Sequence, residues 1–155
     1  MLRTAAIVGL ALWIASCKSK PPPLKAVATL EDVMHHMVIP NAKVVWDSVG
    51  TIYTVGNVKE IQPTTDDQWF AVEQSGTILT EAGNLLMMEG RAKDNGHWMD
   101  RARALREAGA SVHDAAKARN VAAVFERGGQ LFDACQGCHF EYRYTKGDSK
   151  MFRSH

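Results

Sequence analysis

Four stretches of this sequence place apolar residues at intervals of three and four, which is the spacing of one helix face. They run over residues 29–50, 65–88, 98–116 and 120–143. Residues 51–63 lose this spacing, so we expect a structured loop with at most a short extended piece there. Because three of the helices are joined by short loops, the sequence predicts an all-α fold, an antiparallel up-down four-helix bundle.

Residues that favour helix starts precede three of these stretches. Thr29 and Thr65 each begin a capping-box pattern, and Asn120 is a suitable N-cap. Pro40 interrupts the first stretch, so it either kinks that helix or opens a new one. Small residues on the apolar faces predict close packing between helices, and they are Gly76, Gly83, Ala102 and Gly109.

The composition excludes several classes of protein. The chain has 155 residues, enough for one domain, and 46% of them are hydrophobic, enough for a core. The formal net charge of +1, from 18 basic and 17 acidic side chains, lacks the basic excess typical of nucleic-acid binders. No Gly-rich phosphate-binding loop occurs, and three cysteines are too few for a disulfide scaffold. We therefore expect no nucleic-acid partner and no nucleotide chemistry.

The N-terminal segment is typical of an export signal. Arg3 precedes an apolar run from Ala5 to Ala15, which is shorter than the roughly 20 residues that span a bilayer. The run ends at Ile14-Ala15-Ser16-Cys17, which resembles the bacterial lipobox. The resemblance implies that residues 1–16 are a signal peptide and that Cys17 is lipidated. The alternative is a plain secretory signal followed by a chance cysteine.

A short spacer follows the signal. Residues 17–25 contain three consecutive prolines, which favour a stiff extended chain. We expect this stalk to join a lipid anchor to a domain over residues 26–145, with a polar tail over 146–155. The expected location is the periplasmic side of a bacterial membrane, with the protein anchored by lipid.

The most specific motif is the run Cys135-Gln136-Gly137-Cys138-His139, which has the C-x-x-C-H pattern of covalent haem attachment. Two thiols add to the two vinyl groups on one porphyrin edge, and the histidine then reaches the iron. At about 100° per residue, Cys135, Cys138 and His139 share one side of a helix. A thioredoxin-like pair expects a βαβ context, and a zinc site needs a second ligand pair. The motif therefore predicts one covalent haem c on Cys135 and Cys138, with His139 as an axial ligand.

The position of this motif near the C-terminus indicates a class. The sequence resembles the class II c-type cytochromes, including cytochrome c-prime and its low-spin relatives, at residues 135–139 and at the following Tyr142-Arg143. These proteins are four-helix bundles whose haem is bound on the last helix. The resemblance thus implies a bundle with covalently bound haem over residues 26–145. It departs from the family at Pro40 and at the long loop 50–64.

The resemblance also implies that the first helix faces the iron opposite the histidine. That helix offers Met34, His35, His36 and Met37. The stretch from Ala28 to Met34 is similar to the start of the periplasmic b-type four-helix cytochrome, whose early methionine is an iron ligand. Met34 is therefore our first choice and Met37 the second, while either histidine, or no protein ligand at all, remains open. Both methionines can also be core residues.

These residues leave three hypotheses on function. The first is a one-electron carrier with His/Met ligation, whose partners would be exported or membrane redox proteins. The second is a five-coordinate haem protein that binds nitric oxide or carbon monoxide. The third is a small peroxidase with His35 or His36 as acid–base group, and we do not expect an enzyme. The resemblance also allows a homodimer.

Four other large side chains have expected positions. Arg91 either pairs with a haem propionate or stabilises its own loop. Trp46, Trp69 and Trp98 lie on the apolar faces, and we expect all three in the core.

Overall fold

The computed structural model describes residues 23–144, most of which are helical. In chain order the elements are α1 (Leu30–Val33), η1 (Met34–Val38), α2 (Ile39–Ser48), β1 (Gly50–Thr54), β2 (Asn57–Ile61), α3 (Asp66–Leu86), α4 (His97–Lys117), α5 (Val121–His139) and η2 (Phe140–Tyr144). The all-α class is confirmed apart from one β-hairpin. The expected signal peptide, Cys17, most of the 17–25 stalk and the 146–155 tail lie outside the described residues. No helix in the described part of the chain combines the length and the apolar character that a membrane crossing requires.

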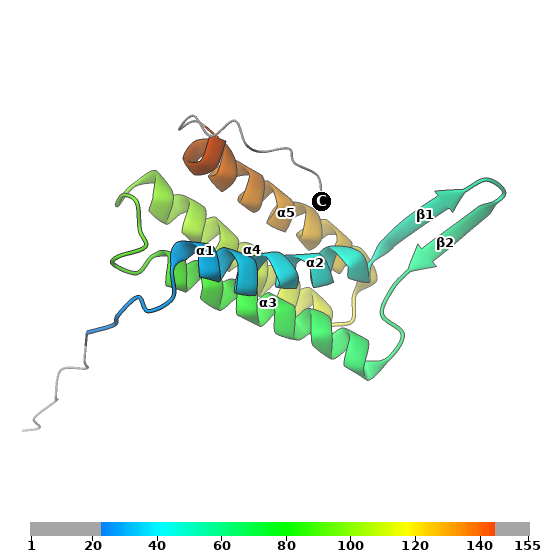
Figure 1. Ribbon diagram of the computed structural model, residues 1–155. Coiled ribbons are helices and arrows are strands. Elements are labelled where there is room, and N and C mark those ends of the chain that lie inside the picture. The colour runs from blue at the N-terminus through cyan, green and yellow to red at the C-terminus, as the bar shows by residue number, and fades with distance from the viewer. Residues whose placement is uncertain (1–22, 145–155) are drawn as a thin grey trace, which may run out of the picture.

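The segments α1, η1 and α2 follow one another without a break (Figure 1). The predicted capping box begins them, because the Thr29 hydroxyl accepts from the Asp32 N–H and the Asp32 carboxylate accepts from the Thr29 N–H, both at 3.0 Å. The segment η1 is π-helical and leads directly to Pro40 in the first turn of α2. The Asn41 side-chain amide donates to the Met37 carbonyl at 2.7 Å. Pro40 thus lies where the π-helical turn passes into α2, and the helical backbone continues through it without a break.

The loop predicted over residues 51–63 is largely an antiparallel hairpin, so the prediction was wrong in its main part. Its strands pair from Gly50 opposite Ile61 to Thr54 opposite Asn57. Gly56 adopts a positive φ of 78° in the turn, a conformation that glycine reaches without strain. Figure 1 shows the hairpin projecting away from the helices.

The helices α3 and α4 lie side by side (Figure 1) and approach closely through glycines. A Cβ built on Gly76 would lie 2.5 Å from the backbone nitrogen of His113, and one on Gly109 would lie 2.6 Å from the backbone nitrogen of Thr80. A Cβ on Gly83 would meet Arg106 at 2.7 Å. The prediction of close packing at the small residues is confirmed for this helix pair.

The core lies between the long helices. Its fully buried side chains of largest volume are Leu79, Leu131, Val33, Val45, Val72, Val112 and Val124. Trp69 and Trp98 are buried as predicted, and the Trp98 indole donates to the Leu86 carbonyl at 2.8 Å. Trp46 is 40% exposed, so the expectation that it lies in the core was wrong. Its ring instead lies at the surface where α2 meets α5.

Candidate functional site

A cavity of about 230 Å³ lies between the first helical segments and α5. Its walls are mostly apolar, as is typical of sites that bind hydrophobic ligands. The residues that line it are Met34, Val38, Ile39, Ala42, Trp46, Leu86, Arg101, Leu105, Phe132, Ala134, Cys135, Gln136, Cys138 and His139. All three chemically reactive residues of the C-x-x-C-H motif are therefore in its wall.

The α5 wall carries the two thiols and the imidazole. The Asn120 side chain caps this helix by accepting from the Ala123 N–H at 3.0 Å, and the helix then runs unbroken to His139. Because the motif occupies its last turns, Cys135, Cys138 and His139 reach the same cavity. Both cysteines are free thiols in this structure.

The electrostatics of the motif keep all three groups uncharged near neutral pH. Burial, with a smaller effect of Cys138, raises the pKa of Cys135 to about 11. Burial also raises the pKa of the Cys138 thiol, although Arg101 opposes the change. Burial and then Arg143 lower the pKa of His139, which favours the neutral imidazole that binds metals. Reactive dithiols have lowered thiol pKa values, so this site does not resemble a thiol redox centre.

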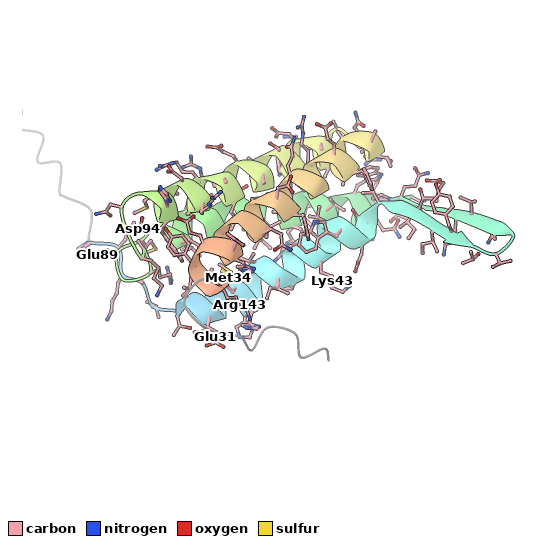
Figure 2. All side chains as sticks on the ribbon, turned by 90° about the horizontal axis from the view of Figure 1, so that it is seen from above. Glu31, Met34, Lys43, Glu89, Asp94 and Arg143 are labelled. Carbon is pink, nitrogen blue, oxygen red and sulfur yellow. The ribbon has the colours of Figure 1, made fainter. Side chains whose placement is uncertain are left out.

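Met34 lines the same cavity as the motif, from η1. It is the first residue of η1 and is only partly buried, packed against the core. Met37 also packs against the core but is not among the residues that line the cavity. His35 and His36 are exposed. Figure 2 shows Met34 at the same end of the molecule as Arg143, which follows the motif.

Arg91 is held in a structural position. It is 5% exposed, and its guanidinium donates to the carbonyl of Ala28 at 3.0 Å and to that of Leu85 at 3.1 Å. These bonds tie the segment before α1 to the end of α3. Arg91 does not line the cavity, so the structure favours its loop-stabilising alternative.

Sequence reasoning missed a polar network that holds the chain directly after His139. The Nδ1 atom of His97 lies 2.6 Å from one carboxylate oxygen of Glu141, and the Arg101 Nε donates to the other at 3.2 Å. The Tyr142 hydroxyl donates to Asp94 at 2.5 Å. These contacts join η2 to α4 and to the loop before it. The partners are 40 or more residues apart in sequence, so no local pattern could have predicted them.

A second hollow of about 350 Å³ adjoins the cavity and shares Trp46 and Phe132 with it. We call it the α2–α5 groove; its lining is Val45, Trp46, Val49, Val124, Phe125, Gly128, Gly129, Phe132 and Asp133. The Trp46 indole donates to the Gly128 carbonyl at 2.9 Å, and its ring meets Phe132 edge-on at 6.1 Å. This aromatic pair separates the groove from the cavity.

Comparisons with known proteins add no relative to this picture. No protein-family model, no curated protein and no solved structure matches the chain. Among the described residues, no three His, Cys, Asp or Glu side chains gather to hold a metal ion directly. The motif and the cavity are therefore the features of this chain that indicate a function.

Proposed function

We propose that this protein is an exported class II c-type cytochrome that carries single electrons. Cys135 and Cys138 would hold one covalent haem c, and His139 and Met34 would ligate its iron. The long helices then correspond to the up-down four-helix bundle of that family. The single observation that carries the proposal is that these four side chains line one apolar cavity.

The residues present fit a covalent haem. Cys135 and Cys138 lie one helical turn apart on the cavity wall, as attachment to one porphyrin edge requires. Next to them, His139 favours its neutral form because it is partly buried. When bound, the haem supplies a one-electron couple at its iron.

The chain's own residues bind, orient and shield the group. The network of His97, Arg101 and Glu141 fixes the turn directly after His139. Val38 and Leu105 add apolar side chains to the cavity wall. Met34 lines the same cavity, and a His/Met ligand pair raises the reduction potential of a haem.

Gas binding is the second candidate function. The observation that favours it is the apolar lining of the cavity, where Val38, Ala42 and Leu105 offer the iron no ligand. In this alternative Met34 does not ligate and the iron is five-coordinate. The peroxidase hypothesis gains no support, because His35 and His36 are exposed and outside the cavity lining.

The location and partners follow from the same proposal. We propose that residues 1–16 direct export and that Cys17 anchors the protein by lipid to the periplasmic side of a bacterial membrane. Its electron-transfer partners are then other exported or membrane redox proteins. No nucleic-acid partner is proposed.

Absorption spectra of the ferric and ferrous protein distinguish the two candidates. We expect a low-spin wild type, a high-spin Met34→Ala variant that binds carbon monoxide, and a low-spin Met37→Ala variant as the matched control. A high-spin wild type that binds carbon monoxide readily selects the gas-binding function. If neither substitution changes the spin state, Met34 is not the ligand.

A further inference from the structure

The β1–β2 hairpin has apolar side chains that are not covered by any other part of the described residues 23–144. Tyr53 and Val58 face each other across the strands and are 77% and 57% exposed, and Val55 at the turn is fully exposed. A two-stranded hairpin is marginally stable in water without further packing. An arm of this kind is therefore expected to pack against another surface.

The α2–α5 groove is a second apolar surface that is open to solvent. Its aromatic residues Phe125 and Phe132 are 65% and 49% exposed. Exposed apolar side chains that adjoin one another are characteristic of interaction sites. Asp133 is the one charged residue in its lining.

We propose that the hairpin of one copy of this chain docks in the α2–α5 groove of a second copy, which forms a twofold symmetric dimer. This proposal does not rest on the haem. Each copy supplies one hairpin and one groove, so a dimer with a twofold axis buries both hairpins and both grooves.

The dimensions of the two surfaces agree. A five-residue strand extends roughly 17 Å. The α5 side of the groove, from Val124 to Asp133, extends roughly 14 Å along the helix. Val49 lines the groove and directly precedes Gly50, the first residue of the hairpin. The hairpin therefore leaves the molecule beside its own groove. A hairpin that enters the partner's groove thus brings the two grooves face to face.

The charges also permit contact between two copies. Lys59 and Glu60 are the only charged residues of the hairpin strands, and their charges cancel. The whole chain carries a formal net charge of only +1, so repulsion between copies is weak. Lys59 supplies a cation that can pair with the carboxylate of Asp133 at the partner's groove.

Light scattering of the purified exported full-length chain in mild detergent tests the proposal. Measuring protein concentration by refractive index, instead of by absorbance, keeps the result independent of haem content. We expect the wild type to be a dimer, and Val55→Asp and Phe125→Ser to weaken dimerisation at least tenfold. Both positions are exposed, so circular dichroism should show an unchanged helix content. Leu24→Ser, which removes an exposed apolar residue before α1, is the matched control and stays dimeric.

Mixing the variants tests arm-to-groove pairing itself. The Val55→Asp protein has intact grooves and the Phe125→Ser protein has intact arms, so the mixture should form a heterodimer that neither forms alone. A monomeric wild type at high concentration overturns the proposal. So does a dimer that either variant leaves unaffected, or a mixture that shows no heterodimer.

Discussion

The Tyr142 hydroxyl donates a hydrogen bond to the carboxylate of Asp94, 48 residues earlier in the sequence. The Tyr142 ring also packs edge-on against Trp98, with ring centroids 4.9 Å apart. Together these contacts fasten η2 to the start of α4. Because η2 begins directly after His139, they also fix the end of the helix that carries the proposed haem ligand.

This hydrogen bond predicts a specific pH dependence. The bond from Tyr142, followed by that from the Trp98 N–H, lowers the pKa of Asp94. A lowered carboxyl pKa contributes stability that is present above the ordinary value of about 4 and is lost as the pH falls through the lowered value. We expect Asp94→Asn to unfold at a lower temperature than wild type at pH 7. The difference in unfolding temperature should narrow as the pH falls below about 4, and it should close below the lowered pKa of Asp94. A gap that is constant between pH 7 and pH 3 would contradict the assignment.

Two glycines make a matched pair for packing between helices. A Cβ at Gly109 would lie 2.6 Å from the Thr80 backbone nitrogen, whereas one at Gly129 meets no atom within 4 Å. Gly109→Ala should therefore destabilise the protein by about 3 kcal/mol or more, because the backbone of α3 must move. Gly129→Ala should stabilise it by about 0.5–1 kcal/mol through helix propensity.

Urea unfolding followed by circular dichroism measures both changes. The two variants introduce the same methyl group, so their opposite signs isolate the effect of the contact between α3 and α4. Equal effects at the two positions would show that this close approach is absent in solution.

Arg91 tests the distinction between structural and haem-binding arginines. Arg91→Ala removes two hydrogen bonds from a buried cation to backbone carbonyls, so we expect a loss of about 3 kcal/mol in stability. The absorption spectrum and the reduction potential of the folded variant should stay those of wild type. A clear shift of the potential at unchanged stability would instead assign Arg91 to a propionate.

Much of the helical framework could be predicted from the sequence because its signals are local. Thr65 accepts from the Gln68 N–H as the capping box predicts, and Asn120 caps α5. The hairpin was missed because its strands bury neither face, so they lack the alternation of apolar and polar residues that marks a half-buried strand. Its only local signal is the glycine of its two-residue turn, Val55-Gly56.

The candidate site was predictable in its covalent part only. The spacing of the motif places Cys135, Cys138 and His139 on one side of any helix. Met34 and Met37 lie three residues apart, so periodicity could not separate them. In the structure the π-helical turn and the packing around it leave only Met34 in the cavity wall. The position of Arg101 depends on packing between distant helices, which periodicity does not specify.

The intact mass of the purified exported protein, made together with an active haem-attachment machinery, tests the central claim most directly. We predict a red protein whose mass exceeds that of its polypeptide, with any lipid, by one haem. The double variant Cys135→Ser, Cys138→Ser should lose this covalent increment. A colourless wild type with no added haem mass would contradict the account.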